Sequence, residues 1–428
     1  MQAVLLLAGQ NKRLWPLNKG MYKALLEIHG KALVEYIIDD LISCGIRSII
    51  IVINSRETDI REYIQSKKNP EAKIQFAFQE KPLGQGNALL QAKQFITDES
   101  FIVPNPYHIN ERDLFRKVIQ KFAENNDLDG LIPAIYEEQI NEYGSMILSE
   151  NRILGIVEKP EKGKEPSKYR ATSLFIFKKD FLDILEKEKE DQYSYEAAIT
   201  KYAQDHTVEM FEIDHDHYIP TLKYPWHMLE LRDHISQKIN GSISPKARIA
   251  PTALIEDTVV VDDGAVIHEG AHLKGHTYVG RNAIVGDYAV IRDSDIGETC
   301  QVGAYSEITR SIIMAGTHSH GGGFIGDSVI GKHCRLGFGF STANKRTDRK
   351  EIATFNRNGE KKNTFLTRMG AVLGHEVKTG SRVTTMPGIL IGGGSHIWPG
   401  VIAHKNVPEM TRLVFKQNLS EETLSTLS

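Results

Sequence analysis

The sequence has few cysteines and no long apolar segment, and each scarcity excludes a class of protein. Its only cysteines are Cys44, Cys300 and Cys334, which are too far apart for a disulfide framework or for the spacing of zinc ligands. The apolar run near the N-terminus follows no basic region and is too short for a signal peptide or a membrane span. We therefore expect a cytoplasmic protein that has no membrane partner.

The chain also lacks a strong excess of charge of either sign. Fifty-two Lys and Arg residues against 55 Asp and Glu residues leave a net charge of −3, so no overall basic field indicates a nucleic-acid partner. A hydrophobic fraction of 41% is typical of globular proteins, and 428 residues are too many for one ordinary core. We expect two domains.

The C-terminal half contains a strict six-residue repeat. From 243 to 291 an aliphatic residue occupies every sixth position: Ile243, Ile249, Ile255, Val261, Ile267, Leu273, Val279, Val285 and Ile291. This period is typical of a parallel β-helix, in which each hexad forms one side of a three-sided coil, whereas the strands of a β-sandwich alternate with period two. We predict a β-helix over 243–410, with a polar insertion at 342–364 and a tail at 411–428.

The N-terminal half alternates strands and helices. Buried-strand patterns at 2–7, 48–53, 74–77 and 101–104 are separated by helical patterns at 34–43, 60–66 and 87–95. This alternation indicates a doubly wound, mainly parallel α/β domain, which we place at 1–237. Ligands of such sheets bind beyond the carboxyl ends of the strands, so the loop after the first strand is the first candidate site.

Motifs in and after that loop carry a family resemblance. The first loop contains Ala8-Gly9, Arg13-Leu14 and Pro16-Leu17, and Lys23 and Gly30-Lys31 follow. Further motifs in the same order are Gln79, 82–88, Tyr143-Gly144, Glu158-Lys159-Pro160 and 175–177. Over residues 1–235 the chain thus resembles the Rossmann-like sugar-1-phosphate nucleotidylyltransferases. With the hexads, it resembles the bifunctional N-acetylglucosamine-1-phosphate uridylyltransferase/glucosamine-1-phosphate acetyltransferases, which implies that the β-helix is left-handed.

The resemblance implies a reaction and a set of binding residues. A nucleoside triphosphate and a sugar 1-phosphate would give a nucleotide sugar and pyrophosphate, with Arg13 binding the triphosphate and Lys23 stabilising the transition state. The positions that match nucleotide-binding and sugar-binding residues are Gly9, Gln79, Gly84, Gly144, Glu158 and Lys159. The simpler interpretation is that Arg13 and Lys23 are solvated loop residues and that Glu158-Lys159-Pro160 is a charged strand end.

The chain departs from the family at the expected magnesium site. The two positions where the family has metal-binding aspartates are Pro106 and Thr221, and neither side chain supplies the carboxylate oxygen that Mg²⁺ prefers. The acidic and histidine-rich stretch 214–217 could replace them, although acidic loop residues are far more often merely solvated. Further departures are Asn11, Tyr22 and Ala171. We therefore assign no metal ligand and expect nucleotidyl transfer to be impaired.

The acyl-transfer site is altered as well. The family's catalytic histidine falls on Gly321, which makes the adjacent His320 the candidate general base and His318 the second choice, unless both are ordinary loop histidines. Arg292 and Asn344 match a phosphate-binding arginine and an active-site asparagine of the acyl-acceptor site. The family's second phosphate-binding cation falls on Thr309, next to Arg310. Acetyl-CoA is the implied co-substrate.

Two functions of different classes follow from these observations. The first is a sugar-nucleotide biosynthesis protein that combines a nucleotidylyltransferase with an acyltransferase-like β-helix. The second is a non-catalytic paralogue that binds a sugar nucleotide and regulates or scaffolds a partner. In either case the expected ligands are a nucleoside triphosphate or sugar nucleotide and a sugar phosphate, and the expected assembly is a homotrimer formed through the β-helix.

Overall fold

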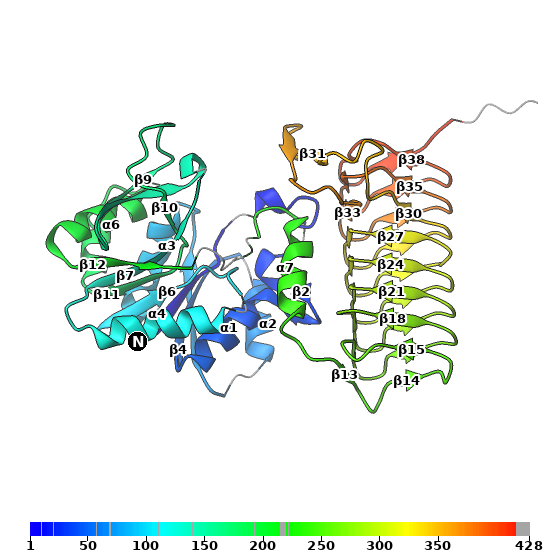
Figure 1. Ribbon diagram of the computed structural model, residues 1–428, viewed down its shortest axis with the longest axis horizontal. Helices are drawn as coiled ribbons and strands as arrows, with labels where there is room; N and C mark the ends of the chain where they lie inside the picture. Colours follow the sequence, from blue (N-terminus) through cyan, green and yellow to red (C-terminus); the bar gives the residue numbers. More distant parts are fainter. Residues whose placement is uncertain are drawn as a thin grey trace, which may run out of the picture. The chain divides into compact units, whose positions relative to one another are not determined.

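A computed structural model of the protein describes residues 1–9, 11–19, 21–56, 58–67, 70–109, 111–138, 140–191, 193–214, 220 and 222–416. Its contacts divide the chain into two compact units (Figure 1). The first, here called the α/β unit, comprises Met1–Asn11, Tyr22–Glu27 and Lys31–Thr221. The second, here called the β-helix unit, comprises Lys12–Met21, Ile28–Gly30 and Leu222–Ser428.

The α/β unit is built on a ten-stranded sheet with the order β10-β8-β9-β12-β7-β11-β6-β1-β4-β5. These strands are β1 (Gln2–Leu6), β4 (Ser48–Asn54), β5 (Lys73–Gln79), β6 (Ser100–Val103), β7 (Gly130–Tyr136), β8 (Gly144–Ser149), β9 (Arg152–Glu158), β10 (Tyr169–Ala171), β11 (Phe175–Lys178) and β12 (Val208–Glu212). The four predicted N-terminal strands are confirmed, and they pair in parallel as β5-β4-β1-β6. The sheet as a whole is mixed, because β11 runs antiparallel to β6 and β7 and because β8, β9 and β10 form antiparallel pairs.

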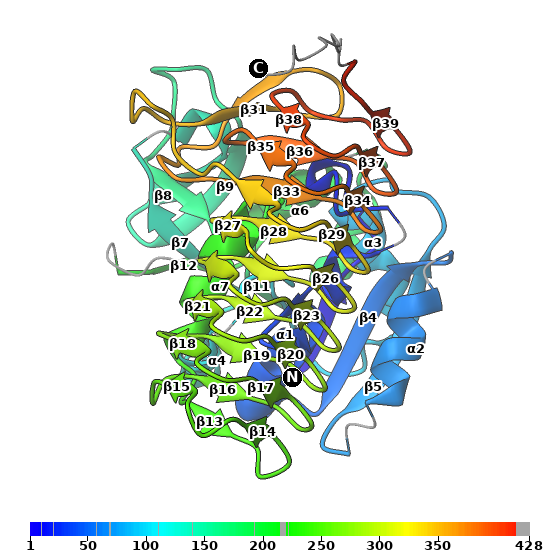
Figure 2. The same ribbon diagram turned by 90° about the vertical axis from the view of Figure 1, so that its right-hand side faces the viewer.

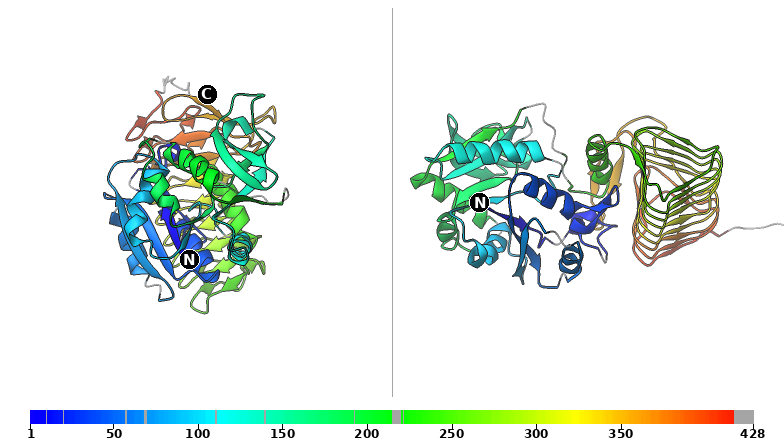
Figure 3. Two further views of the ribbon diagram at one scale, coloured as in Figure 1. Left: turned by 90° about the vertical axis from the view of Figure 1, so that its left-hand side faces the viewer. Right: turned by 90° about the horizontal axis from the view of Figure 1, so that it is seen from below.

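Helices cover both faces of this sheet (Figures 1 and 3). They are α1 (Leu33–Ser43), α2 (Thr58–Ser66), α3 (Gln85–Ala92), α4 (Arg112–Glu124), α5 (Phe181–Leu185) and α6 (Ser194–Asp205). Helices α3, α5 and α6 contribute to one core cluster with the sheet, including the fully buried Tyr195 and Tyr202. The strands are apolar on both sides because they are covered on both sides, which is the pattern expected of a doubly wound sheet.

Strand β1 lies at the point where the strand order reverses. It pairs with β4 on one side and with β6 on the other, so the chain leaves it in one direction and later returns on its opposite flank. In open α/β sheets this arrangement leaves a crevice beyond the carboxyl ends of the two central strands. The loops that follow β1 and β6 therefore form the expected ligand site.

The β-helix unit is a left-handed parallel β-helix with three sides (Figure 2). Side 1 consists of β13 (Ser242–Ile243), β16 (Val260–Val261), β19 (Tyr278–Val279), β22 (Asp295–Ile296), β25 (Ile312–Ile313), β28 (Val329–Ile330), β33 (Ala371–Leu373) and β36 (Ile389–Ile391). Side 2 consists of β14 (Arg248–Ile249), β17 (Val266–Ile267), β20 (Ile284–Val285), β23 (Gln301–Val302), β26 (His318–Ser319), β29 (Arg335–Leu336), β34 (Lys378–Thr379), β37 (His396–Ile397) and β39 (Arg412–Leu413). Side 3 consists of β15 (Leu254–Ile255), β18 (His272–Lys274), β21 (Val290–Arg292), β24 (Glu307–Thr309) and β27 (Phe324–Gly326), and it continues through β30 (Ser341–Thr342), β35 (Thr384–Thr385) and β38 (Ile402–Ala403).

The six-residue rows form the interior of this coil, as the sequence predicts. From Val261 to Ile291 every aliphatic residue of the repeat is at most 1% exposed, and successive coils superpose when viewed along the stack (Figure 3, right). Ile243 is 50% exposed because it belongs to the first coil, which has no coil beneath it. Burial raises the pKa of the interior Cys300 and Cys334 thiols to about 12, so both stay protonated.

A buried ion pair holds helix α7 (His227–Ser236) to side 1. Asp295 on β22 accepts a hydrogen bond from Arg232 Nε at 3.1 Å and another from the backbone N–H of His29 at 2.6 Å. Arg232 is 1% exposed and Asp295 is 3% exposed, so each charge depends on the other for the solvation that burial removes. The segment around His29 and helix α7 thereby cover the outer face of side 1.

The predicted polar insertion interrupts the coil between β30 and β33. It contains the antiparallel hairpin of β31 (Ala353–Phe355) and β32 (Lys361–Asn363), and the coil resumes at Ala371.

In the described part of the chain, no helix is both long enough and apolar enough to cross a membrane.

Candidate functional site

The predicted base-recognition residues are brought together at the end of β5. The Gln79 amide donates hydrogen bonds to Gly84 O at 3.1 Å and to Asn87 Oδ1 at 2.8 Å. Gly84 has φ 103° and precedes α3, a conformation that favours glycine. In the first loop, no atom lies within 4 Å of a Cβ built on the exposed Gly9, so another molecule has room to approach this backbone.

One departure from the family motif keeps the backbone shape of the loop. Asn11 stands where the family has its second glycine, and it has φ 49°. Asparagine adopts this left-handed conformation more readily than most residues, so the substitution preserves the turn.

The expected magnesium position is not suited to a cation in the described residues. Pro106, at the carboxyl end of β6, has no ligand atom, and the next residue, Tyr107, has its ring centroid 3.4 Å from the Lys23 ammonium. Lys23 thus places a positive charge beside the end of β6, and the next carboxylate along the loop is the buried Glu111, which precedes α4. Thr221 and residues 215–217, the other positions considered for the metal, lie outside the described residues.

A buried histidine lies next to this cation. His108 is 5% exposed, and burial lowers its pKa to about 4, with a further lowering from Arg170 and Lys23 and an opposing effect from Glu111. The imidazole is therefore neutral at physiological pH. The end of β6 thus presents a neutral imidazole near the Lys23 ammonium and the buried Glu111 carboxylate.

Strand pairing brings the predicted sugar-binding residues together. Gly144 at the start of β8 is paired with Glu158 at the end of β9, and a Cβ on Gly144 would lie 2.8 Å from Glu158 Oε2. The backbone N–H of Lys159 donates to Tyr143 O at 3.0 Å. Glycine at 144 therefore leaves room for this carboxylate, which would have to move if residue 144 carried a side chain. Burial raises the pKa of the nearby Glu196, and Glu158 raises it further.

Arg13 lies in the other unit. It is exposed in the short 3-10 helix Lys12–Leu14, which belongs to the segment that groups with the β-helix. The two predicted phosphate-contacting cations, Arg13 and Lys23, are thus on chain segments that belong to different compact units.

In the β-helix, the acyl-acceptor residues lie along the end of side 3. Lys274, Arg292, Thr309 and Gly326 are in register on successive coils. Asn344 follows β30 on the same side, and its amide donates to Asp327 Oδ2 at 2.6 Å.

Arg310, which follows Thr309, is already paired with carboxylates. Its Nε lies 3.0 Å from Asp327 Oδ1 and its Nη2 lies 3.4 Å from Asp233 Oδ2. Its charge is therefore largely neutralised within the β-helix unit. Being next to the family's lysine position does not by itself make Arg310 a free phosphate ligand.

His320 lies at a different corner of the coil. It follows β26 of side 2 and precedes β27 of side 3, whereas Arg292 and Asn344 lie where side 3 turns toward side 1. His320 is exposed, and the pKa of His318 is lowered by partial burial and by Arg335 and His320. In one chain, the candidate base and the candidate phosphate-binding residues therefore flank side 3 from opposite edges.

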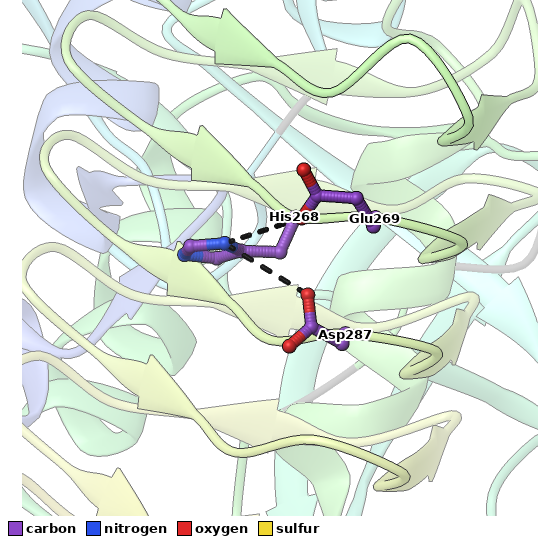
Figure 4. Close-up of side chains that lie close together, drawn as sticks. All are labelled: His268, Glu269 and Asp287. Carbon is purple, nitrogen blue, oxygen red and sulfur yellow. Dashed lines mark ion pairs between the residues drawn. The ribbon is translucent and has the colours of Figure 1, made fainter.

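One group of possible metal ligands occurs among the described residues, at the same kind of corner. His268 Nδ1 lies 3.8 Å from Glu269 Oε2 and 4.0 Å from Asp287 Oδ1 (Figure 4). These side chains are 43 to 61% exposed, so their polar atoms are solvated without a metal. We assign no metal to this group.

Comparison with known proteins agrees with both units. The nucleotidyl transferase family matches residues 2–218. Over 98% of each chain, the protein is 33% identical to the bifunctional protein GlmU of Methanococcus maripaludis. It is also 29% identical to the bifunctional sugar-1-phosphate nucleotidylyltransferase/acetyltransferase of Sulfurisphaera tokodaii, over 95% of this chain and 98% of that one. The chain belongs to this bifunctional family.

A solved structure supports the fold of the α/β unit. A candidate glucose-1-phosphate thymidylyltransferase of Bacillus anthracis matches 56% of this chain and 97% of its own, with a TM-score of 0.50 and 17% identity. As a family member, the protein combines a sugar-1-phosphate nucleotidylyltransferase unit with an acetyltransferase-like β-helix.

Sequence reasoning missed several residues around these sites. Tyr107 and His108 follow the altered metal position, but nothing in their spacing indicates a cation–π contact or complete burial. Asp327 belongs to a hexad motif, yet its partners, Arg310 and Asn344, come from neighbouring coils. Lys274 could have been found, because it precedes Arg292 by 18 residues, which is one full coil.

The buried His108 predicts a loss of stability in acid. The unfolded chain takes up a proton at the ordinary histidine pKa near 6.5, whereas the folded α/β unit does so only near pH 4. As the pH falls from 7 to 4, we expect the free energy of unfolding to decrease by on the order of 3 kcal/mol from this group. NMR titration of the His108 ring in the full-length protein measures the folded pKa directly.

A variant separates this effect from general acid denaturation. His108→Gln is neutral at every pH, so its thermal unfolding midpoint should fall less steeply with acid than that of the parent. A His108 pKa near 6.5, or equal slopes in the two proteins, would contradict the burial argument.

Proposed function

We propose that the α/β unit binds a nucleoside triphosphate or a sugar nucleotide without carrying out efficient magnesium-dependent nucleotidyl transfer. The observation that carries this proposal is the end of β6, where Pro106 replaces a metal ligand and Lys23 lies over Tyr107. The Gln79–Gly84 hydrogen bond and the Gly144–Glu158 pair support continued recognition of the base and the sugar. Lys23 supplies charge for phosphate groups.

Binding and turnover at this unit are expected to separate. Lys23→Ala should weaken binding of UTP or a UDP-sugar about tenfold or more, since a charge-assisted hydrogen bond to phosphate is lost. Lys121→Ala, which removes an exposed cation from α4, should bind like the parent. Titration calorimetry with and without EDTA measures both effects, and chelation should change the affinity little. Magnesium-dependent pyrophosphate release at about 1 per second or faster would overturn the proposal.

For the β-helix unit we propose acyl transfer from acetyl-CoA to an amino sugar phosphate. This chemistry needs a general base and acceptor-binding groups, so the loss of a magnesium ligand elsewhere does not affect it. Arg292 and Asn344 are the acceptor-binding candidates and His320 is the base, lying at the opposite edge of side 3. A neutral imidazole within hydrogen-bond reach of the amine would remove its proton as the acyl group is transferred.

Removal of the base should abolish this activity. His320→Ala is expected to lower the rate of acetyl transfer to glucosamine 1-phosphate about 100-fold or more, while His396→Ala, a change at an exposed histidine of side 2, leaves it unchanged. A thiol-release assay with acetyl-CoA measures the rate. Equal activity in His320→Ala and the parent would remove His320 from the mechanism.

The assembly we propose is a homotrimer formed through the β-helix. Its outer faces are flat and rigid because every coil repeats the same three sides, and flat rigid faces favour association of like subunits. Sedimentation at micromolar protein concentration tests this expectation directly. A single species with the mass of one chain would contradict it.

A non-catalytic role is the second candidate, and the altered end of β6 favours it for the α/β unit. In this case the protein would bind a sugar nucleotide and regulate or scaffold a partner in the cytoplasm. Binding of a UDP-sugar together with neither pyrophosphate release nor acetyl transfer would be the expected combination of results.

A further inference from the structure

Two cations on side 3 lie next to each other on neighbouring coils. Lys274 at the end of β18 is in parallel register with Arg292 at the end of β21, and these strands are adjacent in the stack (Figure 2). Neighbouring strands in a sheet lie about 4.8 Å apart. The intervening Leu273 and Ile291 are 0% exposed, so the cations, one position further along, point to the outer face.

This pair has no neutralising partner within its unit. In the described part of the chain, no carboxylate lies within ion-pair distance of the Lys274 ammonium or of the Arg292 guanidinium. Glu256, the acid in the coil below, directs its Oε2 to the backbone N–H of Gly275 at 2.7 Å. Asp293, the acid next to Arg292, accepts from the backbone N–H of His276 at 3.1 Å.

The next cation along the same edge, Arg310, differs from this pair because carboxylates neutralise it. Arg310 is paired with both Asp327 and Asp233. Like charges opposite each other on neighbouring strands repel and destabilise a sheet unless an ion of opposite charge lies between them. An unneutralised pair on a rigid coil is therefore preorganised for an anion.

The residues above the pair in the same column carry no charge. Thr309 follows Arg292 in register, and Gly326 follows Thr309. His272 lies two residues before Lys274 on the same face; partial burial, Lys274 and Arg292 lower its pKa, against an opposing effect of Glu256 in the coil below.

We propose that Lys274 and Arg292 together bind a phosphoryl group, with Lys274 supplying the second cation that the sequence does not supply at Thr309. A phosphate ester carries close to two negative charges at neutral pH, and Arg and Lys bind it through charge-assisted hydrogen bonds. This inference deepens the acyl-transfer proposal, because the phosphoryl group could belong to the sugar phosphate or to coenzyme A. Lys274 belongs to the coil three below that of β27, roughly 14 Å away, which places this subsite toward the distal part of a bound ligand.

Direct binding to the full-length protein tests the subsite. Titration calorimetry with glucosamine 1-phosphate and, separately, with coenzyme A should give an affinity for at least one of them that falls about tenfold to hundredfold in Lys274→Ala. Lys274→Arg keeps the charge and should retain most of the affinity. Lys246→Ala is the matched control, because this exposed lysine of the preceding coil is already paired with Asp263 at 2.7 Å.

The two ligands separate the sources of the phosphoryl group. Loss of affinity for glucosamine 1-phosphate alone assigns the subsite to the acceptor, and loss for coenzyme A alone assigns it to the acyl donor. Equal affinities in Lys274→Ala and the parent for both ligands, or no binding of either ligand to the parent, would overturn the inference. If affinity is lost in Lys274→Ala but no acetyl transfer is detected in the parent, the subsite stands and the catalytic proposal fails.

Discussion

Parallel pairing of strands one coil apart is the constraint on which the β-helix depends. From Val261 to Ile330 the inward aliphatic residues stack on partners 17 or 18 residues away, as Ile267 does on Val285 and Ile291 does on Ile308. The same pairing fixes the outer positions, because side chains alternate across each short strand. Chemistry on the outer face is therefore organised in columns, and a group such as Arg292 has its nearest partners one coil away rather than next in the sequence.

Ion pairs within the β-helix unit determine which of these outer charged groups remain available to bind a ligand. Asp295 is used by Arg232 and by the backbone of His29, and Asp327 is used by Arg310 and Asn344. Asp233 of α7 lies between these clusters, since it contacts both Arg232 and Arg310. Because removing one partner from a buried pair leaves an uncompensated charge, these residues are committed to the structure of the β-helix unit. Lys274 and Arg292 are outside this network.

The α/β unit retains the contacts between the expected base-binding and sugar-binding residues but lacks a metal-binding carboxylate at Pro106, beyond the end of β6. Gln79 and Gly84 are hydrogen-bonded as a pair, and Gly144 is opposite Glu158 by strand register. At the end of β6, Lys23 lies over Tyr107, and the neutral, buried His108 is followed in the loop by the Glu111 carboxylate. The lysine favours anionic phosphates, whereas Pro106 offers a hard dication no ligand atom.

The sequence by itself determined the two architectures, because both are written in local periods. A six-residue row of aliphatics specifies the coil, and apolar strands separated by amphipathic helices specify the doubly wound sheet. The sequence also implies the proposed second phosphate-binding cation, since Lys274 and Arg292 are separated by 18 residues, the length of one coil. What only the tertiary structure decided is which polar groups are already satisfied: Arg310 is paired with acids from another coil and from α7, and Lys23 lies on an aromatic ring. Those partners are distant in sequence and obey no local period, so no pattern of spacing could have placed them.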